Sequence, residues 1–262
     1  MSKQITIRPG GAFDQIEVEQ SDDVFWSNND SNPHWPVPWC YGLRVDPGKP
    51  SNSFQAVPGG TLPQKLIYQD ALSNQSGVMM VYADFAPQSG PFAGTAGQNS
   101  SISMTSGGKS PYNTSASAGV PSWITFAEST PGNSSGFNAV LTNPPAGSVT
   151  FNLNATDGLG YNIQQPITIT VYPAFQLVPG PYNAHAGQNT SIPLAQGGQS
   201  PYNTSPSTGV PSWITLAQST SQSNGGVFAV LTNPPRGSAT FQLNATDAQG
   251  NNIQQQITIT VT

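Results

Sequence analysis

The clearest pattern in the chain is a strict alternation of apolar and polar residues in short segments. In VTFNLNAT at 149–156 apolar residues alternate with threonine and asparagine, and in ITITV at 167–171 isoleucine and valine alternate with threonine. A period of two places the apolar residues on one face of a β-strand, as in a sheet that packs on a core. The segment ATDGLG at 155–160 supplies aspartate and glycine for a turn between these two strands. No segment shows a sustained helical period, so we predict an all-β fold built from antiparallel sandwiches.

This pattern occurs twice, because residues 81–172 recur ninety positions later as 171–262 without an insertion or a deletion. The repeated segments include SPYNTS at 110 and 200, GVPSWIT at 119 and 209, and LTNPP at 141 and 231. A repeat of about ninety residues is long enough to bury a core of its own. We therefore predict three consecutive antiparallel β-sandwiches, at residues 1–86, 87–174 and 175–262. Since the repeating unit includes the joint, we expect both junctions to have similar geometry and the domains to form an extended arrangement.

Each copy resembles a known group of bacterial domains. The motifs that carry the resemblance are PSWIT, a PP-G turn, the hairpin V-T-F-N-L-N-A-T-D-x-x-G and the closing strand I-T-I-T-V. Their order is similar to that of bacterial Ig-like domains and of dystroglycan-type cadherin-like domains. The chain has Thr142-Asn143-Pro144-Pro145 where that family usually carries a Gly-Thr-Pro turn. The resemblance implies a seven-stranded sandwich that serves as a spacer, adhesive module or scaffold on bacterial surfaces, without catalysis.

The region from Ile5 to Tyr82 resembles the cupredoxins in the spacing of its motifs. The segment VFWSNND at 24–30 precedes His34, and a Pro-Gly turn, a Ser-Phe strand and Tyr68 follow in the cupredoxin order. The resemblance implies a second kind of sandwich with His34 at the position of a copper ligand. A blue-copper site needs two imidazoles and a thiolate, and the segment from Tyr68 to Tyr82 contains neither a cysteine nor a histidine. We therefore expect a cupredoxin-like domain without a copper site, and no cofactor.

The composition is polar but almost uncharged, with only 7% of residues Asp, Glu, Lys or Arg. Seven basic residues against twelve acidic ones disfavour nucleic acid and an anionic membrane surface as partners. No stretch approaches the 18 or so apolar residues of a membrane span, and the start MSKQITIRPGG lacks the apolar run of a signal peptide. Cys40 is the only cysteine, so it cannot form an internal disulfide. Together with the family resemblance, this favours an extracellular, cell-surface or virion location.

The small number of histidines and cysteines disfavours a catalytic site built on these residues. The only histidines are His34 and His185, and His185 falls in a predicted linker. The pairing of His34 with Cys40 lacks a nearby orienting carboxylate, and the side chains of Asp22 and Asp23 point to opposite faces of a strand. We predict that the chain is not an enzyme.

Calcium binding at the junctions between domains is disfavoured for a similar reason. Calcium takes six to eight oxygen ligands, several of them anionic. The first junction offers Asp84, and the second offers no acidic residue. We interpret Asp157 and Asp247 as residues that turn their hairpins.

Aromatic residues in loops are the candidates for an interaction surface. Trp35, Trp39 and Tyr41 surround two prolines, and a proline-rich loop with two tryptophans is hard to bury completely. Simple packing of this loop on its domain is the alternative. Tyr112 and Tyr202, in the two SPYNTS segments, are the corresponding repeated candidates.

These features predict a non-enzymatic structural or adhesive protein that acts through protein-protein contacts. It would be a subunit of an extracellular fibre, a cell-surface layer or a virion decoration, and its partner would be a second copy or another surface or virion protein. Because the chain ends directly after a predicted strand, we expect lateral or end-to-end attachment. One alternative is a carbohydrate-binding accessory protein that stacks glycans on the loop of Trp35, Trp39 and Tyr41. A second alternative is a degenerate cupredoxin redox domain.

Overall fold

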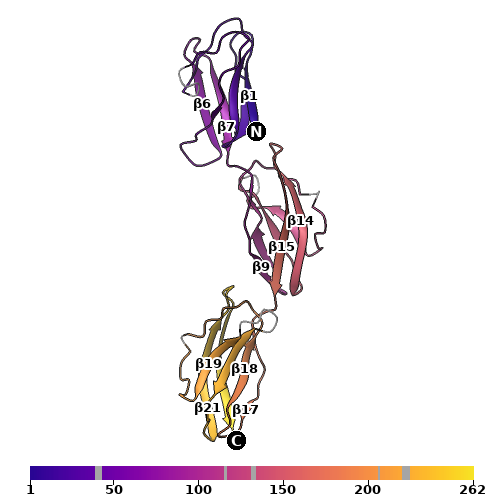
Figure 1. Cartoon of the computed structure of the whole chain (residues 1–262), viewed down its shortest axis with the longest axis vertical. Helices are drawn as coiled ribbons and strands as arrows, with labels where there is room; N and C mark the ends of the chain where they lie inside the picture. The colour runs from indigo at the N-terminus through magenta and orange to yellow at the C-terminus, as the bar shows by residue number, and fades with distance from the viewer. Residues whose placement is uncertain (39–42, 115–116, 131–133, 206, 220–224) are drawn as a thin grey trace. The chain divides into compact units, whose positions relative to one another are not determined.

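In the computed structural model, every secondary-structure element formed by the described residues is a β-strand, and turns and loops connect the strands (Figure 1). The structure describes all residues except 39–42, 115–116, 131–133, 206 and 220–224. The prediction of an all-β fold is therefore confirmed. No helix in this described part could cross a membrane. The chain forms two compact units, which consist of residues 1–91, 101–140 and 150–168, and of residues 92–100, 141–149 and 169–262.

The described residues of the N-terminal region form two sheets from seven strands. These strands are β1 (Ser2–Ile7), β2 (Ile16–Glu19), β3 (Asp23–Asn28), β4 (Pro36–Val37), β5 (Phe54–Gln55), β6 (Gln64–Asp70) and β7 (Ser76–Tyr82). One sheet has the order β1-β3-β5 and the other has the order β2-β7-β6-β4. Burial alternates strictly along β6, as a strand with one face on a core requires.

Aromatic rings fill the core of the N-terminal region. The rings of Trp26 and Tyr68 meet edge to face with their centroids 4.5 Å apart, and Phe13 packs edge to face on both. The Tyr68 hydroxyl donates to the carbonyl of Asp14 at 3.1 Å. Tyr68 also lies directly against Gly77, where an added Cβ would come within 2.2 Å of its hydroxyl oxygen. Only glycine at this position leaves room for the ring.

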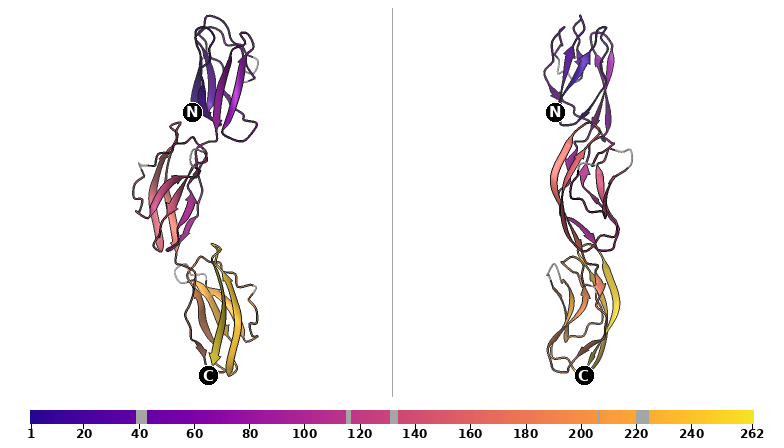
Figure 2. Two further views of the ribbon diagram at one scale, coloured as in Figure 1. Left: turned by 180° about the vertical axis from the view of Figure 1, so that it is seen from behind. Right: turned by 90° about the vertical axis from the view of Figure 1, so that its right-hand side faces the viewer.

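The two copies of the repeat have corresponding strands, arranged in two layers (Figures 1 and 2). The first copy contains β8 (Ala86–Pro87), β9 (Phe92–Thr95), β10 (Ser100–Ser103), β11 (Thr105–Ser106), β12 (Ile124–Glu128), β13 (Phe137–Leu141), β14 (Gly147–Thr156) and β15 (Asn162–Tyr172). The second contains β16 (Gln176–Leu177), β17 (Tyr182–Ala184), β18 (Thr190–Gln196), β19 (Ile214–Ser219), β20 (Gly226–Leu231), β21 (Gly237–Thr246) and β22 (Asn252–Val261). The second copy has sheets β16-β18-β20-β19 and β17-β22-β21.

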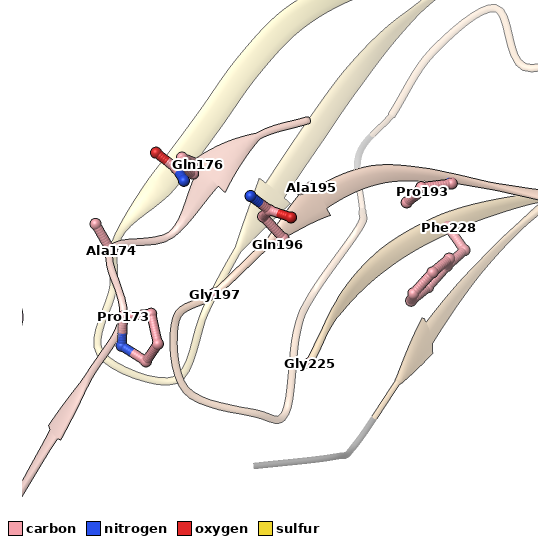
Figure 3. Close-up of a pocket in the computed structure, with 9 residues that line it drawn as sticks. All are labelled: Pro173, Ala174, Gln176, Pro193, Ala195, Gln196, Gly197, Gly225 and Phe228. Carbon is pink, nitrogen blue, oxygen red and sulfur yellow. The ribbon is translucent and has the colours of Figure 1, made fainter. Parts of the chain in front are cut away.

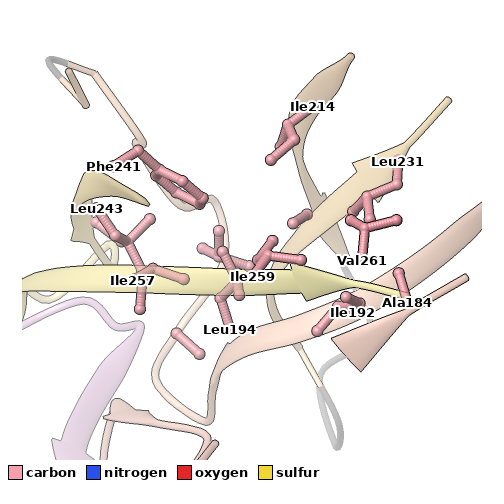
Figure 4. Close-up of a cluster of buried hydrophobic side chains, with 14 of the residues drawn as sticks. Ala184, Ile192, Leu194, Ile214, Leu231, Phe241, Leu243, Ile257, Ile259 and Val261 are labelled. Carbon is pink, nitrogen blue, oxygen red and sulfur yellow. The ribbon is translucent and has the colours of Figure 1, made fainter. Parts of the chain in front are cut away.

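The long hairpins β14-β15 and β21-β22 form where the alternating pattern predicts them. In the second copy Phe241 pairs with Ile257 on the buried face, and Thr240 pairs with Thr258 on the exposed face. The buried side chains of β18, β20, β21 and β22 meet in one core, which Figure 4 shows around Leu194 and Ile259.

Four of the sheets contain a parallel pair and are not purely antiparallel as predicted, whereas the sheet β16-β18-β20-β19 is antiparallel throughout. Strand β1 runs parallel to β3, β2 to β7, β9 to β15 and β17 to β22. In each copy, the early strand joins the edge of the sheet that contains the closing strand. The chain then crosses to the other sheet before it returns in the closing strand, and β9 and β17 run in the same direction as the closing strands β15 and β22.

Candidate interaction surfaces

The predicted aromatic loop of the N-terminal region is described only in part. Trp35 is half-buried and packs against the aromatic core. Its backbone N–H donates to a carboxylate oxygen of Asp70 at 2.6 Å, and its carbonyl accepts from the N–H of Ala71 at 2.9 Å. Trp39 and Tyr41 lie outside the described residues. Trp35 itself is thus held on its domain, as the packing alternative requires.

Each of the repeated tyrosines stacks on a phenylalanine. Tyr202 is only 5% exposed, stacks on Phe175 with ring centroids 5.4 Å apart, and donates its hydroxyl to the carbonyl of Gly197 at 2.8 Å. Tyr112 stacks on Phe85 at 5.5 Å in the same way. A buried tyrosine needs a partner for its hydroxyl, and the backbone of a glycine-rich loop provides one here. The expectation that Tyr202 forms an interaction surface is corrected, because its ring belongs to the core. Tyr112 is partly exposed, and its place in an interaction surface stays a prediction.

A buried histidine between two carboxylates occupies the position that the cupredoxin resemblance gives to a copper ligand. The Nδ1 atom of His34 lies 2.8 Å from Asp70 Oδ2, and its Nε2 atom lies 3.1 Å from Asp30 Oδ2. All three side chains are less than 10% exposed. Both ring nitrogens are therefore used in hydrogen bonds, and neither is free to bind a metal.

The carboxylates around His34 are stabilised in their ionised form. Hydrogen bonds from the backbone N–H of Gly10 and from His34 hold the pKa of Asp30 well below its usual range. Burial acts to raise the pKa of Asp70, but hydrogen bonds from Ser73, the Trp35 N–H and His34 outweigh it and lower the pKa. The arrangement suits a structural network of hydrogen bonds around His34, which the sequence did not reveal because Asp70 is distant along the chain.

Asp247 turns its hairpin by accepting backbone hydrogen bonds. Its Oδ1 atom accepts from the N–H groups of Gln249 at 3.0 Å and Asn251 at 2.8 Å, and its Oδ2 atom accepts from Gln199 at 3.1 Å. Asp157 makes the same set of bonds in the first copy. The interpretation of both residues as turn residues is confirmed. Within the described ranges, no group of three His, Cys, Asp or Glu side chains is placed to hold a metal ion.

Glu19, at the end of β2, is a buried carboxyl among other acidic residues. Burial raises the pKa of Glu19 to about 7, against a lowering effect of the hydrogen bond from the Phe85 N–H at 2.8 Å. The charges of Asp157, Asp84 and Asp22 raise the pKa further. The folded chain thus favours the protonated form of this group.

The substitution Glu19→Gln should flatten the pH dependence of stability. A carboxyl whose pKa is higher in the folded chain binds its proton more tightly there, so its contribution is complete below its ordinary pKa of 4.5 and is lost as the pH rises through about 7. Glutamine keeps an oxygen for the Phe85 N–H but cannot ionise. We expect the melting temperature of the variant to fall less than that of the parent between pH 4.5 and 7. Thermal unfolding across this range measures the effect, and the exposed substitution Asp23→Asn serves as control; equal slopes for parent and Glu19→Gln would contradict the assignment.

One sheet of each repeat contains no charged side chain. None of the strands β9, β14, β15, β17, β21 and β22 includes Asp, Glu, Lys or Arg. In residues 173–262 the only such residues are Arg236 and Asp247. Native sheets usually protect their edges with charges, prolines or bulges. These sheets lack the charges.

Strands β14 and β21 form an edge of these sheets and are only partly covered. In β21, Gln242 pairs with Thr208 of a loop and Thr246 pairs with Asn203 of the same loop. Because backbone groups alternate in direction along a strand, the even-numbered residues of β21 direct their N–H and C=O groups away from β22. By the same alternation, Ser238 and Thr240 direct their backbone groups toward the open side, where the described residues provide no partner. The N-terminal half of β14 has the same geometry, since its covering bridges lie at 152 and 156.

Solved structures that match the chain, all at TM-scores below 0.4, include Ig and cadherin chains. The I-band fragment I67-I69 of titin has a TM-score of 0.38 and 10% identity over 99% of this chain and 96% of that chain. The mouse clustered PcdhgC3 EC1-3 has a TM-score of 0.30 and 14% identity over 84% and 85%. The endo-fucoidan hydrolase MfFcnA9 of glycoside hydrolase family 107 has a TM-score of 0.34 and 19% identity over 68% of this chain. The chain spans 34% of MfFcnA9 and 36% of the related MfFcnA4.

Comparison with curated proteins gives no match. A comparison with protein families finds one family that matches both copies of the repeat. The family described as "Putative Ig domain" matches residues 82–172 and, separately, residues 173–262. These two matches cover more than half of the chain and follow the repeat that is visible in the sequence. The chain therefore belongs to this family, with two tandem copies of the Ig domain.

Proposed function

We propose that the chain is a non-enzymatic structural or adhesive protein whose Ig repeats associate through the open edges of β14 and β21. The observation that carries this proposal is an edge strand of ten residues, present in both repeats, whose first half has outward-facing backbone groups and no charged side chain. Such an edge can add a strand from another chain, with the backbone hydrogen bonds of a continuous sheet.

The charge distribution supports association of the repeats. Charges of opposite sign, on Arg236 and Asp247, leave residues 173–262 with no net charge. Fourteen of the nineteen charged residues lie in residues 1–86. Repeats with little or no net charge approach one another with little of the repulsion that keeps charged proteins apart. The partner is accordingly a second copy of the chain or another surface protein, in a fibre, a cell-surface layer or a virion decoration.

The N-terminal region is proposed as a cupredoxin-like domain that has lost copper binding. The support is its two-sheet arrangement and the place of His34, whose ring nitrogens face Asp30 and Asp70. In this proposal the hydrogen bonds between His34 and the two carboxylates take the place of the metal. A redox role for the domain has no support from these contacts.

Lysine substitutions at the open edges test the proposed association. In the double variant Ser148→Lys and Ser238→Lys, each lysine lies exposed on the open half of an edge strand, where a positive charge opposes strand addition. We expect the variant to lose at least tenfold in association constant by sedimentation velocity, with an unchanged circular dichroism spectrum. The charge-matched control is Gln98→Lys with Gln188→Lys, in exposed turns away from the edges. Equal association of the edge variant and the parent would show that the edges are not the interface.

A further inference from the structure

The second repeat carries a pocket of about 320 Å³ on the outer face of its four-stranded sheet (Figure 3). The aromatic residue of this pocket is Phe228, whose neighbours Val227 and Ala229 are buried. Because side chains alternate along β20, the ring of Phe228 lies on the face opposite the core. This volume is at the small end of the range for ligand pockets.

The strand register brings two apolar and two polar side chains together at this pocket. Phe228 pairs with Pro193 across β20 and β18, and Gln176 pairs with Gln196 across β16 and β18. Gly226 lies opposite Gln196 and has no side chain to fill the space beside Phe228. A Cβ at Gly226 would come within 2.1 Å of the Ala195 carbonyl oxygen, so this position stays open.

The polar groups of the pocket are two carboxamides without charge. Gln176 and Gln196 are exposed, and neither side chain makes a hydrogen bond with another described residue. A carboxamide both donates and accepts hydrogen bonds, as a hydroxyl group does. The described lining includes no Asp, Glu, Lys or Arg, so it offers nothing to neutralise an ionic ligand.

We infer that this pocket is a binding site for a neutral carbohydrate. A hexose ring has an apolar C–H face that fits against the ring of Phe228 and against Pro193. Its hydroxyl groups then face the carboxamides of Gln176 and Gln196. The inferred site is separate from the open edge of β21, because it lies on the other sheet of the repeat.

Backbone hydrogen bonds hold the frame of the pocket in place. The N–H of Gly197 donates to the carbonyl of Gly225 at 3.1 Å, and the N–H of Gly198 donates to the carbonyl of Pro173 at 2.8 Å. Gly197 has a φ of +76°, and a Cβ there would come within 2.2 Å of the Ala174 carbonyl oxygen. A frame that is formed before the ligand arrives reduces the entropy lost on binding.

The first repeat provides an internal comparison, because the same positions lack these groups. Ninety residues earlier, Phe228, Pro193, Gln196 and Gln176 correspond to Asn138, Ser103, Ser106 and Ala86. There the side chain of Asn138 accepts a hydrogen bond from the Ser129 hydroxyl at 2.9 Å. The first repeat therefore has neither an aromatic platform nor a pair of free carboxamides at this place.

The site can be removed by substitutions that the first repeat already carries. We expect at least one of the neutral tetrasaccharides of glucose, mannose or galactose to bind the full chain. The binding should shift the side-chain amide signals of Gln176 and Gln196 in ¹H–¹⁵N NMR spectra. The triple variant Gln176→Ala, Gln196→Ser and Phe228→Asn should bind the same sugar at least tenfold more weakly. The substitution Gln188→Ala, in a distant exposed turn, serves as the matched control and should leave binding unchanged.

Several results would overturn the inference. They are no binding of any of the three sugars, equal binding by the triple variant, or equally tight binding of an anionic galacturonate tetrasaccharide. The spectra are recorded below the concentration at which the chain associates. If instead the triple variant mainly abolishes self-association, the pocket belongs to an interface between copies and the carbohydrate site is refuted.

Discussion

Asp247→Ala is expected to lower the free energy of unfolding of the second repeat by about 4 kcal/mol. The carboxylate is buried and accepts hydrogen bonds from the backbone N–H groups of Gln249, Asn251 and Gln199. Alanine removes both acceptor oxygens and leaves three partly buried backbone donors without these partners, while a hydrogen bond to a charged group contributes about 1.5–3 kcal/mol. Hydrogen exchange measured by mass spectrometry on peptides from residues 173–262 reports the stability of this repeat separately from the rest of the chain.

Two further variants separate the hydrogen bonds of Asp247 from its volume. Asp247→Asn keeps the side-chain shape and one oxygen acceptor, so we expect a smaller loss than for alanine. Asp157→Ala removes the same bonds from the first repeat and should produce a similar loss there. If the amide hydrogens of residues 173–262 exchange no faster in Asp247→Ala than in Asp247→Asn, the backbone hydrogen bonds are not what stabilises the turn.

Gly77→Ala is expected to destabilise the N-terminal region by about 3 kcal/mol or more, as overpacking of a filled core does. The added Cβ would lie 2.2 Å from the Tyr68 hydroxyl oxygen and 2.3 Å from two ring carbons. Tyr68 is 1% exposed and packs on Trp26, so the ring cannot move aside without disturbing the core. The midpoint of guanidinium unfolding, followed by tryptophan fluorescence, measures the change.

Gly59→Ala is the matched control for this substitution. Gly59 has no heavy atom within 4 Å of the place where a Cβ would stand, and its φ is not positive. We expect a change of less than about 0.5 kcal/mol, as for most surface substitutions. A comparable loss in both variants would mean that the flexibility of glycine, and not the contact with Tyr68, determines the effect.

The local pattern of the sequence was sufficient for the strands and hairpins of the repeats. The alternation in 149–156 and 167–171 predicted β14 and β15, and the aspartate of the ATD segment predicted their turn. The parallel pairing of β9 with β15 was not predicted. It joins segments more than seventy residues apart, and no local pattern determines which strand lies at the edge of a sheet.

The candidate surfaces were harder to predict, because exposure depends on contacts that are distant in sequence. Tyr202 looked available in a polar loop, but Phe175 and Gly197 cover its ring and bind its hydroxyl. The pocket beside Phe228 did leave a signal in the sequence. At this position the second copy replaces the asparagine of the first with a partly exposed aromatic residue. Differences between copies of a repeat are therefore as informative as the identities.

The oligomeric state of the unmodified chain tests the central claim most directly. Sedimentation velocity over a hundredfold range of protein concentration, with negative-stain microscopy of the same samples, would measure it. An adhesive or structural protein with open, uncharged edges at β14 and β21 is predicted to form dimers or longer assemblies as the concentration rises. A chain that sediments as a monomer at every concentration, and forms no fibres or layers, would contradict self-association through these edges.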